Sequence, residues 1–133
     1  MTMRVLSTKA HGVLDYLMAG MLLALPWLLG WSAPLRLLLM VLALGMLTYS
    51  LFTRYELGAF RAIPMRAHLG LDIVGGLVLV AVALMMTYEP TGVRWTLGIL
   101  GMAELGAALL TDPNRTTLPA DNTAAMRRRS PGV

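Results

Sequence analysis

The stretch "HGVLDYLMAGMLLALPWLLGW", residues 11–31, decides the fold. Beyond Asp15 it holds no charged side chain. A helix needs about 20 mostly apolar residues to cross the hydrocarbon core of a bilayer. The stretch lacks the period-two alternation of a half-buried strand, and backbone groups in lipid must be satisfied inside a helix or a closed barrel. It therefore predicts a transmembrane helix.

The composition extends this interpretation to the whole chain. Of its 133 residues 57% are hydrophobic and only 14% are charged, and the mean hydropathy is +0.68. Soluble domains carry about 25% charged residues, so this chain lacks the polar surface of a water-facing domain. The absence of cysteine excludes disulfides, thiol catalysis and cysteine-ligated metal sites. The basic residues flank apolar runs, which predicts the lipid bilayer as the partner and no nucleic acid.

Four apolar runs follow one another, at about 13–31, 35–53, 69–88 and 95–110. They predict an all-α fold, a bundle of four transmembrane helices over residues 1–112. A polar segment at 113–133 is predicted to be a disordered cytoplasmic tail. A cleaved signal peptide is the alternative for the first run, but that run is longer than the 7–15 apolar residues of a signal peptide.

The chain repeats itself. At an offset of 57 several residues match, namely Ala10–His11 with Ala67–His68 and Leu14–Asp15 with Leu71–Asp72. After the hairpin the offset is 56, because Pro34 matches Pro90 and "LGM" at 44–46 matches "LGM" at 100–102. The pattern predicts two parallel helical-hairpin repeats, about 9–55 and 66–112, related by an axis along the membrane normal.

Lysine and arginine predict the orientation. Nine of them lie in the N-terminal segment, the loop between the second and third runs and the tail, while the two hairpin loops carry only Arg36 and Arg94. Short loops rich in lysine and arginine stay in the cytoplasm. Both termini are therefore predicted to be cytoplasmic.

The repeated pairs His11 with Asp15 and His68 with Asp72 are the first candidate site. Residues four apart share a helix face, and the repeat places both pairs at the same depth near the cytoplasmic face. Three interpretations stay open. In the first, the acids have a structural role and accept hydrogen bonds from a histidine or from Arg54 or Arg66. In the second, the pairs handle protons or a ligand, since histidine titrates near neutrality. In the third, the histidines ligate a metal or haem. The first is preferred, and no cofactor or metal is predicted.

Glu104 is the second candidate. It lies in the fourth run among small residues, which allow helices to approach closely. An acid at this depth is expected to face the bundle interior. Hydrogen bonds to Thr48, its partner in the repeat at offset 56, or to Tyr49 or Ser50 are expected. The alternative is a functional acid in a cavity.

Three segments carry a resemblance to a known family: "HGVLDYLMAGMLLALPWLLGW", "YELGAFRAIPMRAHLGLDIVGG" and "GMAELGAALLT". With Leu25-Pro26-Trp27 at the place of the namesake Ser-Pro-Trp, the chain resembles the SPW-repeat family of small bacterial integral membrane proteins. The resemblance implies a multi-pass protein of the bacterial inner membrane. It implies no activity, cofactor or catalytic residue.

The sequence holds no nucleophile–base constellation, phosphate loop or clustered metal-ligand spacing, so no enzyme activity is predicted. The predicted function is a non-enzymatic structural or partner-binding membrane component, its partner being a second copy or another membrane protein. The alternative is a small transporter or a ligand- or proton-binding module that uses the intramembrane acids.

Overall fold

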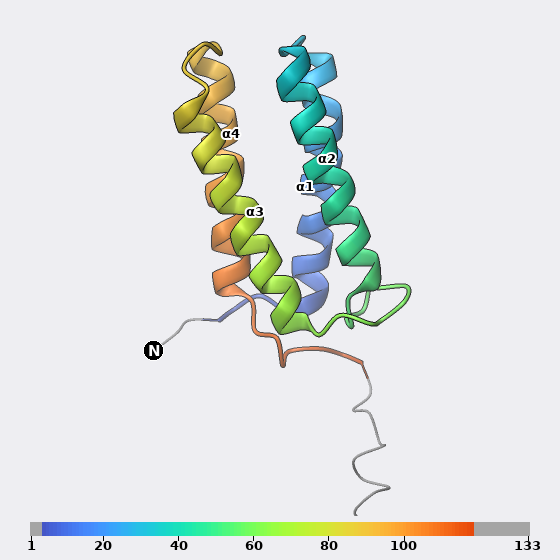
Figure 1. The fold of residues 1–133 in the computed structure, drawn as a ribbon. Helices are drawn as coiled ribbons and strands as arrows, with labels where there is room; N and C mark the ends of the chain where they lie inside the picture. Colours follow the sequence, from blue (N-terminus) through green and yellow to red (C-terminus); the bar gives the residue numbers. More distant parts are fainter. Residues whose placement is uncertain (1–3, 119–133) are drawn as a thin grey trace, which may run out of the picture.

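The computed structural model describes residues 4–118 of the chain (Figure 1). It has four helices: α1 (Thr8–Leu28), α2 (Ala33–Phe52), α3 (Met65–Met85) and α4 (Thr91–Leu110). In this part of the chain the only β-structure is two isolated bridges. Each helix is long and apolar enough to cross a membrane. The predicted all-α four-helix fold is confirmed, and it suits a multi-pass membrane protein.

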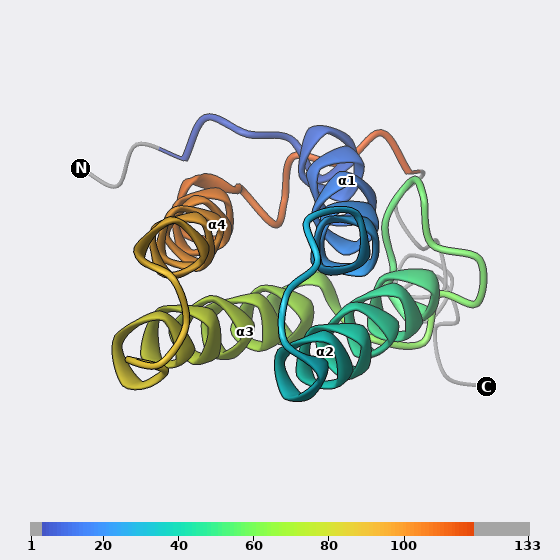
Figure 2. The same ribbon diagram turned by 90° about the horizontal axis from the view of Figure 1, so that it is seen from above.

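The two hairpins, α1–α2 and α3–α4, stand side by side. Seen from above, α1 lies beside α4 and α2 lies beside α3 (Figure 2). The N-terminal segment, the loop between α2 and α3 and the segment after α4 all gather at one end of the bundle (Figure 1). Both ends of the described chain therefore lie on the same side, as an even number of crossings requires.

Helices α1 and α3 begin earlier than the apolar runs that predicted them. The Ser7 side chain accepts a hydrogen bond from the backbone N–H of Ala10 and caps α1, so the helix includes a polar first turn that hydropathy leaves out. Asp15 and Asp72 consequently lie seven residues after the first residues of α1 and α3. At 1.5 Å per residue this is about 10 Å along the helix, or about two helical turns from its first residue.

The pattern of buried residues confirms the repeat and corrects part of its register. Buried positions of α1 recur in α3 at the predicted offset of 57. In the second helices the offset is 58, not 56, and the equivalent buried positions are Leu35, Leu39, Ala43, Met46 and Ser50 in α2 and Val93, Leu97, Gly101, Glu104 and Ala108 in α4. The matched "LGM" triplets mislead, because they pair buried Met46 with exposed Met102. The counterpart of Glu104 is therefore Met46, not Thr48.

The first residues of the predicted tail contact the folded chain. Arg115 donates a side-chain hydrogen bond to the carbonyl oxygen of Val5, and its own carbonyl accepts from the backbone N–H of Thr8. Thr116 and Thr117 donate hydrogen bonds to Glu56 in the loop between α2 and α3. The remaining predicted tail, 119–133, lies outside the described residues.

Candidate metal centre

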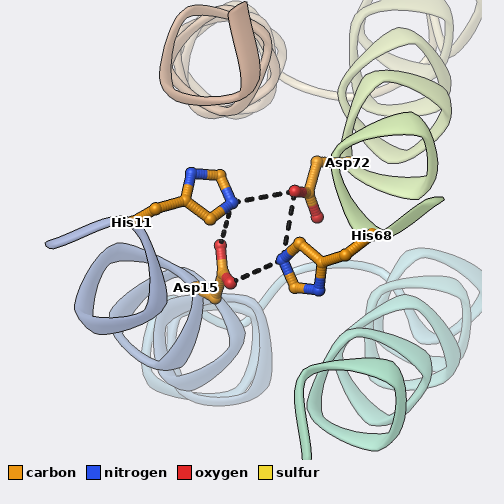
Figure 3. A group of neighbouring side chains, drawn as sticks. All are labelled: His11, Asp15, His68 and Asp72. Atoms are coloured by element: carbon orange, nitrogen blue, oxygen red, sulfur yellow. Dashed lines mark hydrogen bonds and ion pairs between the residues drawn. The ribbon is translucent and has the colours of Figure 1, made fainter. Parts of the chain in front are cut away.

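The two His/Asp pairs come together in one buried cluster, which we call the His/Asp centre: His11 and Asp15 from α1, His68 and Asp72 from α3 (Figure 3). All four side chains are buried, and none is more than 4% exposed. One ligand atom from each residue lies within 4.8 Å of the other three. The sequence repeat predicts that the two pairs lie at the same depth in the bundle. The structure shows in addition that α1 and α3 bring the two pairs into contact, so they form a single site.

Each histidine contacts both carboxylates through the same ring nitrogen. Nε2 of His11 lies 2.9 Å from Oδ2 of Asp72 and 3.2 Å from Oδ1 of Asp15. Nε2 of His68 lies 2.9 Å from Oδ2 of Asp15 and 3.2 Å from Oδ2 of Asp72. The shorter contact of each histidine is the one that crosses to the other hairpin. The centre therefore joins the two repeats.

Two threonines determine which nitrogen of each ring carries a hydrogen. Oγ1 of Thr53 lies 2.7 Å from the carbonyl oxygen of Tyr49 and 2.8 Å from Nδ1 of His68. A carbonyl oxygen only accepts and a hydroxyl has one hydrogen, so the hydroxyl donates to the carbonyl and Nδ1–H of His68 donates to the hydroxyl. Thr111 repeats the arrangement, at 2.6 Å from the carbonyl oxygen of Ala107 and 2.9 Å from Nδ1 of His11.

In both histidines the hydrogen-bearing Nδ1 points to a threonine, and the other ring nitrogen, Nε2, points to the carboxylates. A neutral imidazole that carries its hydrogen on Nδ1 presents a lone pair at Nε2, and a lone pair repels a carboxylate. Something positive must therefore lie between Nε2 and the carboxylates. Two protons, one on each ring, satisfy this requirement, and so does one divalent metal ion. Either choice balances the two negative charges of Asp15 and Asp72.

The donor set and spacing fit a first-row metal ion. Neighbouring ligand atoms at about 2.0–2.1 Å from a metal are roughly 2.8–3.0 Å apart in a square-planar site and roughly 3.3–3.4 Å apart in a tetrahedral site. The four nitrogen–oxygen separations of 2.9–3.2 Å lie between these limits. Metal-bound histidines commonly donate their second N–H to a fixed acceptor, which orients the ring. Thr53 and Thr111 supply this acceptor.

Two tyrosines complete the surroundings and make them asymmetric. Tyr49 donates a hydrogen bond of 2.6 Å to Oδ1 of Asp72. Tyr55, which is fully buried, packs 5.6 Å from the ring of His68 and against Gly12, where any Cβ would overlap its ring. Tyr55 belongs to the loop between α2 and α3, at the end of the bundle where both ends of the described chain lie, and it closes the centre on that side.

Sequence reasoning missed both threonines. A signal was present, because "SLFT" at 50–53 and "ALLT" at 108–111 end the second helix of each repeat with the same residue. The offset between these threonines is 58, which is the register of the buried positions. The sequence predicts Tyr49 only as a partner for Glu104, whereas its hydroxyl contacts Asp72.

The arginines expected beside the acids are not there. Arg54 donates its Nε–H to the carbonyl oxygen of Arg61, and Arg66 is exposed. Among the described residues, the ion pairs of Asp15 and Asp72 are with the two histidines alone. Arg66 lies on the exposed face of α3, whereas His68 and Asp72 of the same helix are buried.

Glu104 stands outside the centre, and its expected hydrogen bonds are absent. The side chain is buried, yet neither carboxylate oxygen has a partner in the part of the chain that is described. Thr48 instead donates to the carbonyl oxygen of Leu44, and Tyr49 donates to Asp72. The register shift explains the error, because offset 58 places Thr48 on the exposed face of α2.

Outside the membrane-spanning segments, Glu56 ties three parts of the chain together. It accepts hydrogen bonds from Thr8 at the start of α1 and from Thr116 and Thr117. Partial burial alone would raise the pKa of Glu56, but the hydrogen bonds favour the carboxylate and lower the pKa from 4.5 to about 2. This junction lies at the same end of the bundle as the His/Asp centre.

We compared the chain with protein-family models, with curated proteins and with solved structures, and none of the three comparisons finds a match.

Proposed function

We propose that the chain is an integral membrane protein that binds one divalent transition-metal ion at the His/Asp centre. The carrying observation is the orientation of the histidines. Both Nε2 atoms face the two carboxylates, while both Nδ1–H groups are held by threonine hydroxyls. A metal-ligating histidine uses the second feature to fix its tautomer. The ligand spacing supports the metal, because the four nitrogen–oxygen separations of 2.9–3.2 Å suit neighbouring ligands of one ion.

The charges make the centre an exchanger of one metal ion for two protons. Without metal, two imidazolium rings neutralise two carboxylates. When a divalent ion binds, it takes the Nε2 lone pairs, both Nε2 protons leave, and the net charge stays zero. Charge balance matters here because an uncompensated charge at membrane depth is costly. Metal affinity should therefore rise with pH, since protons and metal compete for the same nitrogen atoms.

The ligand types narrow the choice of ion. Imidazole nitrogen suits Zn²⁺, Cu²⁺, Fe²⁺ and Ni²⁺, and carboxylate oxygen is shared with Mn²⁺. Mg²⁺ and Ca²⁺ prefer six or more oxygen ligands, which two buried aspartates do not supply. We therefore infer that the protein is a binding module or a small transporter for a transition-metal ion. Of the roles predicted from sequence, it is closest to the ligand-binding alternative.

The predicted location is retained as part of the proposal. The nine-to-two distribution of basic residues supports cytoplasmic termini, and the quoted motifs support a bacterial inner-membrane protein of the SPW-repeat type. The His/Asp centre would then lie about two helical turns from the cytoplasmic surface. No enzyme activity is proposed, and a second copy or another membrane protein remains the predicted partner.

A second function is favoured by one specific observation. The cross-hairpin contacts of 2.9 Å are ordinary hydrogen-bond lengths, so the four residues satisfy each other when both rings are protonated. A proton-handling cluster that takes no metal would have this geometry too.

Titration calorimetry with Zn²⁺ separates the two. We expect one ion per chain and, in buffers of different ionisation enthalpy at pH 7, release of two protons per ion. His68→Ala should abolish binding, and Glu104→Gln should leave it unchanged, because Glu104 lies outside the centre. Absence of saturable binding, or equal binding by the His68→Ala protein, would show that the centre handles protons alone.

A further inference from the structure

A groove between α2 and α3 lies beside the His/Asp centre and is separate from it. Its volume is about 200 Å³, and its walls are almost entirely apolar. Val41, Leu71 and Val74 line it and are 42–58% exposed, so it opens on the outer, lipid-facing surface of the bundle. Two polar side chains line it: Glu104 from α4, which is only 5% exposed, and Tyr49 from α2.

Glu104 reaches this groove because Gly75 leaves a gap in α3. A Cβ at position 75 would lie 2.8 Å from Oε1 of Glu104. In the first hairpin the equivalent positions, by offsets 57 and 58, are Met18 and Met46, and both are buried in the apolar core. One hairpin thus has two methionines where the other has a glycine and an acid. The fold is built without an acid at this position, so packing does not explain Glu104.

We propose that the groove binds a small lipophilic organic cation, an amine or a quaternary ammonium ion, with Glu104 as its counter-ion. A carboxyl group without a partner in an apolar setting is costly, and a cation that brings its own apolar surface removes that cost. The hydroxyl of Tyr49 is already bonded to Asp72, which leaves its ring on the groove wall. An aromatic face attracts ammonium groups.

Other ligand classes fit the groove less well. A hard metal ion needs several oxygen ligands, and the groove offers one carboxylate. An anion would be repelled by Glu104, and a sugar would leave its hydroxyl groups unpaired against the apolar walls. The volume equals about seven waters at ~30 Å³ each, which limits the ligand to a small molecule. The opening toward lipid favours a ligand that partitions into the bilayer first.

The test compares benzyltrimethylammonium with its neutral isostere neopentylbenzene, in which carbon replaces the charged nitrogen. Equilibrium dialysis of the purified protein in detergent, with empty micelles as the blank, measures binding of each. We expect saturable binding of the cation and at least tenfold weaker binding of the neutral compound. Glu104→Gln should weaken cation binding at least tenfold, while Glu89→Gln, another buried acid at the far end of the bundle, should not change it.

Equal binding of the two compounds, or full cation binding by the Glu104→Gln protein, would show a groove that only holds lipid chains and would overturn the proposal. Absence of saturable cation binding would do the same. A second variant, Val74→Trp, alters only an exposed position at the mouth and should weaken binding by obstructing entry. The measurement is made without added metal, so its result is independent of Zn²⁺ binding at the His/Asp centre.

Discussion

Thr111 and His11 are 100 residues apart in the sequence, and Oγ1 of the threonine lies 2.9 Å from Nδ1 of the histidine. The threonine follows the last residue of α4, and the histidine lies in the first turn of α1. Thr53 and His68 form the same contact from α2 to α3. Each hairpin therefore fixes the histidine of the other, and the metal-binding orientation of the rings depends on the association of both hairpins.

The threonines should control metal affinity. Thr111→Val keeps the shape of the side chain but removes the acceptor for Nδ1–H of His11. Loss of such a partner typically lowers metal affinity 10–100-fold, and Zn²⁺ titration should show a decrease of this size. Thr111→Ser should restore most of the affinity. Thr48→Val is the matched control, because Thr48 bonds its own helix in the same way but touches no histidine. A Thr111→Val protein with parental affinity would mean that the ring needs no fixed acceptor.

Removing the charge of either buried aspartate should strongly lower the free energy of unfolding. Asp72→Asn leaves two buried imidazolium rings with one carboxylate. Breaking a buried ion pair by removing one partner costs about 3–5 kcal/mol. We expect a loss of about 3 kcal/mol or more in the free energy of unfolding in detergent at pH 7. Asp112→Asn is the control, because that acid lies outside the centre and an amide can still accept from Asn114. A near-neutral Asp72→Asn would show that water reaches the centre.

Gly12 is required by the ring of Tyr55. A Cβ at position 12 would overlap that ring, which is fully buried and cannot move aside freely. Gly12→Ala should therefore destabilise the protein by about 1–3 kcal/mol, the usual cost of overpacking. Gly20→Ala in the same helix meets no atom within 4 Å and should be neutral or stabilising. Equal melting temperatures for the two variants would place Tyr55 elsewhere in solution.

The hydrogen bonds that Glu56 accepts from Thr8, Thr116 and Thr117 should make the stability of the protein sensitive to acid. Its pKa is lowered in the fold, from 4.5 to about 2, so its contribution to stability is present above pH 4.5 and is lost as the pH falls toward 2. We expect Glu56→Gln to lower the melting temperature at pH 7 and to lower it much less at pH 2.5, where most of the contribution of the carboxylate is already lost. An unchanged difference between parent and variant at the two pH values would contradict this linkage.

When no ligand occupies the groove, Glu104 should lower the free energy of unfolding. Replacing it with methionine, the residue at the equivalent position 46, removes a buried carboxyl group that has no partner. The free energy of unfolding should rise by about 1–3 kcal/mol. The reverse change, Met46→Glu, should lower the melting temperature, because the equivalent of Gly75 in that hairpin is Met18 and no gap receives the acid. A less stable Glu104→Met protein would mean that Glu104 has a partner in solution.

The sequence alone determined the helices and their repetition. Runs of about 20 apolar residues admit no other structure in lipid than a helix or a closed barrel, and a tandem of two hairpins places His11 level with His68. These are local properties, or properties of a symmetric repeat, and both are visible in composition and spacing. The family resemblance and the cytoplasmic orientation were also inferred from sequence, and they stay predictions.

Only the tertiary structure decided what the polar residues do. Whether two His/Asp pairs at one depth meet or face apart depends on the rotation of α1 and α3 about their axes, which spacing along the chain does not set. The same is true of the 58-residue register in α2 and α4, because burial and not residue identity determines it. Glu104 was therefore paired with Thr48 from sequence, whereas packing makes Met46 its counterpart. The threonine contacts join residues from different hairpins, and such contacts arise only when the hairpins pack.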